Sequence, residues 1–268
     1  MDPLAILGVA LMLFPTMAML AICRHALRGG HGPASFLFLF FAGAMSVIPV
    51  LIIGRLIYAF VVLPEGAITR PLFEAFGMAA LIEEGCKFAV FASLGYLVRN
   101  ELKPSQAIWA GIALACGFAT VENFKFMLVF GADDIELSLL RGLLVLPAHA
   151  LDGALLGYVF ARAKFRPRHS TRLTLLLGYL AVVTAHGLYD FMLLSDFGLS
   201  FLAFGVSLVE ALIVAWGVLQ LRGIDAQLDR CVMVLEPDVA DRRPAWQSEL
   251  WLRAPTVSTL LASRSISD

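Results

Sequence analysis

Long apolar segments alternate with short polar connections over residues 1–222 of the chain. A helix needs about 20 mostly apolar residues to cross a bilayer. Seven segments meet this requirement, at residues 4–23, 34–62, 72–98, 105–130, 137–161, 173–194 and 199–221. Residues 223–268 are more polar and form a tail. The pattern predicts an all-α fold, a polytopic transmembrane helix bundle in residues 1–222, followed by a C-terminal tail in residues 223–268.

The composition supports a membrane protein. Hydrophobic residues make up 60% of the chain and charged residues 15%, whereas soluble domains average about 45–50% and about 25%. The net charge of −1 provides no basic surface, so no nucleic-acid partner is expected. The four cysteines are scattered, which argues against a disulfide framework or a cysteine zinc site. The first apolar segment has no basic stretch before it, so we interpret it as a retained helix.

Basic residues concentrate in every second connection and at the start of the tail. They are Arg24, Arg28, Arg99, Lys103, Arg162, Lys164, Arg166, Arg168, Arg172, Arg222 and Arg230. Cytoplasmic loops of membrane proteins carry an excess of lysine and arginine. We therefore expect the N-terminus outside and the C-terminal tail in the cytoplasm, in a multi-pass protein of the cell membrane.

Ionisable residues lie inside six of the seven predicted spans, where they are rare and costly. The third span carries Glu83, Glu84 and Lys87, and Arg55 in the second is interpreted as a snorkelling or helix-pairing residue. The later spans carry Glu122 with Asn123, His149 with Asp152, His186 with Asp190, and Glu210. With a rise of about 1.5 Å per residue, Glu83, Glu122, His149 and His186 lie about 12–18 Å below the predicted outer surface. This similar depth predicts one shared polar cavity, at mid-membrane or somewhat toward the outside.

Spacing within each helix adds detail to this cavity. Glu83 and Lys87 are four residues apart, so they share a face and can pair, while Glu84 points about 100° away. Asp190 follows His186 by four residues and can hold its imidazole in one tautomer. The GxxxG pair formed by residues 153 and 157 predicts a close approach of the fifth span to a neighbour.

These residue types fit hydrolysis. A glutamate can deprotonate water, and a histidine or the Asn123 amide can stabilise an oxyanion. Two histidines and a carboxylate can also hold a catalytic zinc, here Glu122, His149 and His186, although no HExxH signature is present. A proton- or cation-coupled transporter and a bundle held together by polar contacts use similar residues. The residues alone favour a hydrolase and leave these two alternatives open.

The polar segments also resemble the motifs of the PrsW family of intramembrane proteases. Residues 83–87 are similar to its EExxK motif, residues 118–123 to its FxxxEN motif, His149 with the following glycines to its third motif, and residues 186–190 to its HxxxD motif. The four matches occur in the family's order within residues 72–194. The family is grouped with the type II CAAX prenyl endopeptidases, and the group also includes a non-catalytic scaffold.

The resemblance implies hydrolysis of a peptide bond within or beside the bilayer. It implies Glu83 as the base that activates water and Glu84 as its neighbour, with Glu122 where the prenyl endopeptidases have a histidine. His186 and Asp190 would stabilise the oxyanion, His149 would complete the site, and Lys87, Asn123 and Asp152 would support it. The implied substrate is a membrane-anchored protein such as an anti-sigma factor, and the implied location is the bacterial cytoplasmic membrane. The resemblance leaves a glutamic and a zinc-dependent mechanism open.

Overall fold

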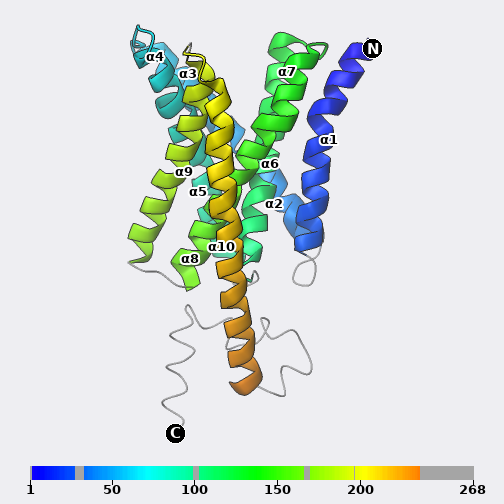
Figure 1. Cartoon of the computed structure of the whole chain (residues 1–268), viewed down its shortest axis with the longest axis vertical. Coiled ribbons are helices and arrows are strands. Elements are labelled where there is room, and N and C mark those ends of the chain that lie inside the picture. The colour runs from blue at the N-terminus through cyan, green and yellow to red at the C-terminus, as the bar shows by residue number, and fades with distance from the viewer. Residues whose placement is uncertain (1, 28–32, 99–102, 166–169, 196, 236–268) are drawn as a thin grey trace.

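The computed structural model describes residues 2–27, 33–98, 103–165, 170–195 and 197–235. Within these ranges the chain forms helices and no strand (Figure 1). The helices are α1 (Pro3–Ala26), α2 (Pro33–Met45), α3 (Val47–Phe60), α4 (Thr69–Leu72), η1 (Phe73–Ala80), α5 (Leu81–Val98), α6 (Gln106–Phe130), α7 (Ile135–Leu140), η2 (Arg141–Val145), α8 (Leu146–Phe165), α9 (Thr171–Leu194) and α10 (Ser200–Leu235).

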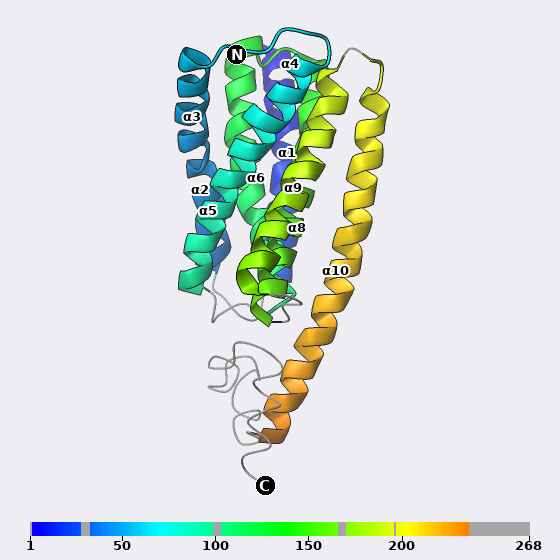
Figure 2. The same ribbon diagram turned by 90° about the vertical axis from the view of Figure 1, so that its left-hand side faces the viewer.

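The predicted helix bundle is confirmed. Six helical stretches of the described chain are long and apolar enough to cross a membrane, and they correspond to six of the predicted spans. The remaining predicted span is the stretch formed by α4, η1 and α5, which carries Glu83, Glu84 and Lys87 near its middle. The last helix continues past the predicted end of its span, to Leu235. Figure 2 shows α3 and α10 at opposite edges of the bundle.

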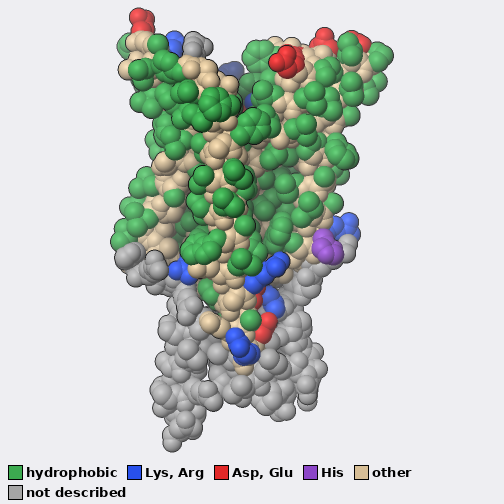
Figure 3. Space-filling view, in the orientation of Figure 1, with side chains coloured by type: hydrophobic (Ala, Val, Ile, Leu, Met, Phe, Trp, Pro, Cys, Tyr) green, Lys and Arg blue, Asp and Glu red, His purple; other side chains and the backbone are tan. Residues whose placement is uncertain are grey.

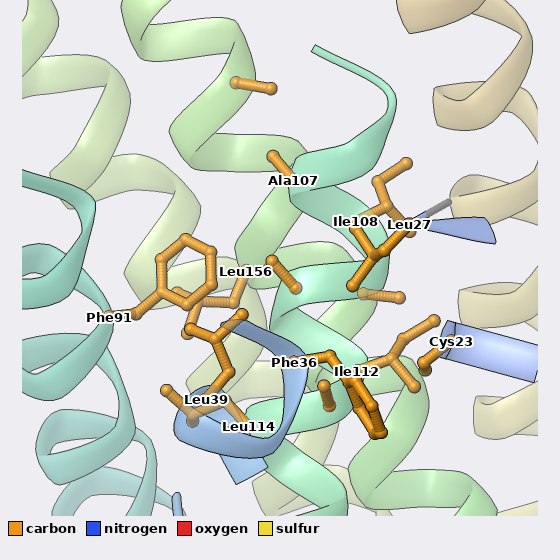
Figure 4. Packing of buried hydrophobic residues seen from close by; sticks show 14 of the residues in the cluster. Cys23, Leu27, Phe36, Leu39, Phe91, Ala107, Ile108, Ile112, Leu114 and Leu156 are labelled. Carbon is orange, nitrogen blue, oxygen red and sulfur yellow. The ribbon is translucent and has the colours of Figure 1, made fainter. Parts of the chain in front are cut away.

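Helix α6 forms the centre of the bundle, because most of its side chains are buried. Leu114 of α6 packs in one apolar cluster with Leu39 of α2, Phe91 of α5 and Leu156 of α8 (Figure 4). The predicted close approach involves this helix. A Cβ atom at Gly153 would meet the backbone oxygen of Gly111, and one at Gly157 would meet that of Ala107. Small residues therefore let the backbones of α6 and α8 nearly touch, which fixes the motifs on the two helices relative to each other.

Two π-helical segments, η1 and η2, lie within otherwise α-helical stretches, and neither was predicted. Segment η1 ends three residues before Glu83, and η2 ends four residues before His149. π-Turns accommodate an additional residue in a helix and are frequent at functional sites. Both segments thus precede a polar motif by about one turn.

The surface of the bundle is largely hydrophobic over its whole height (Figure 3). Acidic residues gather at the end that contains the start of α10, and basic residues at the opposite end, where α10 continues beyond the other helices. The orientation in the membrane and the division at residue 222 remain predictions. Arg28, Arg99, Arg166, Arg168 and residues 236–268 lie outside the described residues. Cys23, Cys86 and Cys116 are free thiols.

Candidate active site

The polar residues of four helices meet inside the bundle. Eight of the residues selected from the sequence are buried, with at most 8% of their surface exposed: Glu83, Glu84, Lys87, Glu122, Asn123, His149, Asp152 and His186. They come from α5, α6, α8 and α9. Asp190 lies at the edge of the cluster with its side chain 25% exposed. By contrast, Arg55 is exposed on α3.

Lys87 connects three of these helices. Its Nζ atom donates to Glu84 Oε1 at 2.6 Å and to His149 Nδ1 at 3.2 Å, and it lies 4.2 Å from the centre of the Phe118 ring. The predicted pairing of Lys87 with Glu83 is wrong in this structure, because the described ion pair is with Glu84. The Oε1 atom of Glu84 that pairs with Lys87 also contacts Nδ1 of His186 on α9, and this second contact holds the Glu84 carboxylate near the lysine.

The contacts of His149 define its protonation. A lysine ammonium can only donate hydrogen bonds, so Nδ1 of His149 accepts from Lys87. The ring proton then lies on Nε2, which donates to Glu122 Oε2 at 3.0 Å. His149 is therefore a neutral imidazole that joins the lysine to a glutamate.

His186 lies among three carboxylates. Its Nδ1 atom is 2.7 Å from Glu84 Oε1 and 3.3 Å from Asp152 Oδ2, while its Nε2 atom is 3.3 Å from Asp190 Oδ2. The His186–Asp190 contact expected from the spacing is thus present. Both ring nitrogens face acids, so His186 is held in position from two sides.

Arg141 is a member of the cluster that the sequence analysis missed. It lies in η2 and is 6% exposed. Its Nη2 donates to Glu122 Oε2 and its Nε to Asn123 Oδ1, both at 2.8 Å, and its guanidinium lies 3.7 Å from the centre of the Phe126 ring. The sequence analysis did not include it among the polar residues of the spans. Its position four residues inside the predicted fifth span was the available signal.

Glu210 of α10 is the second missed member. It is 5% exposed, and its side chain contacts that of Asp152. Glu210 Oε1 and Asp152 Oδ1 have no hydrogen-bond donor among the described side chains. Two carboxyl groups in contact are stable when they share a proton or a cation. The sequence showed Glu210 alone on its helix, and its partner comes from a different helix.

The contact between Glu210 and Asp152 leads to a testable prediction. Glu210→Gln keeps a group that can donate to Asp152, so we expect cleavage within about threefold of wild type, whereas Glu210→Leu leaves a buried carboxylate oxygen unpaired. We expect Glu210→Leu to lose about 1–3 kcal/mol of stability and to lower the turnover number. Thermal unfolding in micelles and steady-state kinetics measure the two effects. Equal behaviour of the two variants would contradict the pairing.

Glu83 differs from the other acids of the cluster. Its Oε2 atom is buried and has no hydrogen-bond partner in the described part of the chain. A carboxylate oxygen of Glu83, a carboxylate oxygen of Glu122 and a ring nitrogen of His149 all lie within 4.8 Å of one another. The Nδ2 atom of Asn123 is likewise buried without a described partner. A carboxylate oxygen of Glu83 and the amide nitrogen of Asn123, the residue next to Glu122, are therefore both buried without a described partner.

Carboxylates and imidazoles of the cluster are also suitable ligands for a metal ion. Glu84, His149, Asp152 and His186 form a second group, in which one possible ligand atom from each residue lies within 4.8 Å of the others. Glu84 and Asp152 each have an unpartnered buried oxygen, and Asp190 at Nε2 of His186 matches the carboxylate that usually orients a metal-binding histidine. In contrast, Nδ1 of His149 is occupied by Lys87. The ligand set expected from the sequence is thus divided, since Glu122 and His186 fall in different groups.

Comparison with known proteins agrees with this site. The model of the PrsW family, described as intramembrane metalloproteases, matches residues 32–218. The chain is 34% identical over 160 residues to "Protease PrsW" of Shouchella clausii, covering 60% of this chain and 70% of that protein. It is 32% identical over 183 residues to the protein of the same name from Halalkalibacterium halodurans, covering 67% and 80%.

A further relative is "Protease PrsW" of Bacillus subtilis, 28% identical over 154 residues, with 58% of this chain and 67% of that protein covered. No solved structure matches the chain. The family match spans α2 to α10 and includes every residue of the cluster. The buried acids and histidines on four helices, together with this match over most of the chain, show that the protein belongs to the PrsW family of intramembrane proteases.

Proposed function

We propose that the chain is an endopeptidase that hydrolyses a peptide bond of a membrane-anchored protein with a water molecule activated by Glu83. The observation that supports this most strongly is the free carboxylate oxygen of Glu83, buried beside Glu122 and His149. A buried carboxylate without a partner is costly, and a base needs such an oxygen within reach of its water.

The reaction follows from the contacts of the cluster. Glu83 accepts a proton from water, and the water oxygen attacks the carbonyl carbon of the substrate peptide. The free amide of Asn123 donates to the oxyanion that develops. Glu83 then returns the proton to the leaving nitrogen as the carbon–nitrogen bond breaks. Because both nitrogens of His186 face carboxylates, we assign His186 to holding Glu84 and Asp152 in place.

Lys87 and Arg141 supply the fixed positive charges of this arrangement. Each lies within 2.8 Å of a carboxylate oxygen and is fully desolvated or nearly so. A zinc ion, if it takes part, would be held by Glu84, Asp152 and His186 and would polarise the water and the substrate carbonyl. The roles of Glu83 and Asn123 as base and oxyanion donor are the same in both cases.

The proposed substrate is a protein anchored by a single membrane span, such as an anti-sigma factor. A cation-coupled transporter is the alternative, since it also carries intramembrane acids and histidines. It would move ions across liposomes and release no product peptide. A non-catalytic scaffold of the same fold would do neither.

Co-expression with a single-span reporter tests the proposed function. We expect a product peptide whose cut site, mapped by mass spectrometry, lies in the half of the reporter segment nearer the outer surface. The reason is the predicted depth of about 12–18 Å for the four key residues. A cut at the cytoplasmic end would contradict the predicted topology, and the absence of any product would contradict the protease assignment of this chain.

A further inference from the structure

A cavity of about 220 Å³ lies beside the polar cluster, where η2 and α8 approach α9 and α10. Its lining is almost entirely apolar. Ala148, Tyr189 and Ala203 form a buried floor. Leu143 and Phe204 line its rim and are 57% and 58% exposed on the bilayer-facing surface. The cavity is therefore closed toward the bundle and open toward the membrane.

The cavity lies one helical turn from the cluster on three helices. Three pairs make this connection: Ala148 with Asp152 on α8, Tyr189 with His186 on α9, and Ser207 with Glu210 on α10. Residues three or four apart share a helix face, about 5.4 Å per turn. The Tyr189 side chain also interacts electrostatically with Asp190, Arg141 and His186. Tyr189 of the cavity floor therefore also borders the cluster.

We propose that this cavity binds one large apolar side chain of the substrate, such as leucine or phenylalanine, beside the peptide bond that is cut. This inference rests on the proposed function. The continuity with the cluster favours a substrate side chain over a lipid chain, because a peptide that is cut at the cluster has its neighbouring side chains within about one helical turn of the cavity. The volume is below the roughly 300–1,000 Å³ of pockets for small-molecule ligands and suits a single side chain.

The expected selectivity is moderate. Lipid tails are as apolar as the cavity, so the hydrophobic effect does not drive a side chain from the bilayer into it. Discrimination comes from packing against the floor and walls. One methylene in an apolar pocket changes enzyme selectivity by roughly 10-fold or more. That figure applies to substrates taken from water, and the hydrophobic part of it is absent in a bilayer, so we expect leucine or phenylalanine to be preferred over alanine by only about 10-fold at one substrate position.

Filling the cavity tests the proposal. The probe is the single-span reporter with its cut site mapped, carrying leucine, phenylalanine or alanine in turn at each of the neighbouring positions. Ala203→Leu and Ser207→Leu place side chains in the cavity from two levels of α10. Leu208→Phe is the matched control, because it enlarges a residue of the same helix that is 62% exposed. Relative cleavage rates are measured in membranes for each enzyme and reporter.

In the wild type and in Leu208→Phe, we expect the preference for the large side chain at one position. In Ala203→Leu and Ser207→Leu, the ratio of rates should fall toward one at that position only. An unchanged ratio of rates in both filled variants would overturn the proposed binding of a substrate side chain in the cavity. So would an equal loss of rate for every reporter, which is expected if a lipid chain occupies the cavity. Neither outcome would contradict the proposed protease function. If the wild type cleaves no reporter, the proposed function fails as well.

Discussion

Replacing Glu83 by glutamine is expected to reduce cleavage of the reporter by about 10²–10⁴-fold, the usual contribution of a general base. Glutamine has nearly the same size and shape, so the packing around residue 83 is retained. The change removes the free carboxylate oxygen that would accept the proton of water. Product formation in membranes measures the effect, and the amount of folded protein is followed in the same samples.

Glu74→Gln is the matched control for this prediction. Glu74 lies in η1, on the same continuous helical stretch, where it pairs with Arg70 at the surface. An exposed ion pair of this kind contributes about 0–1 kcal/mol, so Glu74→Gln should cleave at the wild-type rate. Wild-type cleavage by Glu83→Gln would exclude Glu83 as the base and would shift attention to Glu84 and Glu122.

Replacing Arg141 by methionine is expected to have the largest effect on stability. Arg141 is the buried partner of Glu122 at 2.8 Å and also binds Asn123. Methionine retains apolar packing but leaves the carboxylate of Glu122 without its guanidinium. Removing one member of a buried ion pair costs about 3–5 kcal/mol, so the melting temperature in micelles should fall substantially.

The double variant Arg141→Met with Glu122→Gln separates stability from catalysis. With no unpaired buried charge left, most of the lost stability should return; Lys125, which also pairs with Glu122, is 41% exposed and can be solvated. Cleavage should stay low, because glutamine does not restore the negative charge of Glu122 beside His149 and Glu83. Arg55→Met, at an exposed arginine on α3, is the control and should change neither quantity. A melting temperature equal to wild type in Arg141→Met would show that the pair does not stabilise the bundle.

The sequence predicted the site through the high cost of ionisable groups in a bilayer. Glu83, His149 and His186 stand out because each interrupts an apolar run, and the structure buries all three within one cluster. Glu84 was harder to interpret. Helical spacing suggested that Lys87 pairs with Glu83, but His186 on another helix positions Glu84 toward the lysine, and spacing within one helix contains no information about such a partner.

Arg141 and Glu210 were missed for related reasons. Arg141 lies where a π-turn changes the direction of side chains, and a period of 3.6 residues assumes that no such turn is present. Glu210 has no ionisable neighbour within one turn of its own helix, so only the packing of α10 against α8 reveals Asp152 as its partner. The helix bundle was simpler to predict, because length and apolarity suffice to define a span.

The three charged residues of α5, Glu83, Glu84 and Lys87, have a consequence for the synthesis of the protein. Helix α5 leaves the ribosome before α6, α8 and α9, yet the partners of Lys87 and Glu84 on other helices are His149 and His186. Each charge at the centre of a span adds roughly 2.5–3.5 kcal/mol to its insertion. Helix α5 therefore inserts poorly on its own, and its stable placement in the bilayer awaits helices that are translated later. For α5, stable insertion into the membrane therefore depends on the same contacts with α8 and α9 that assemble the site.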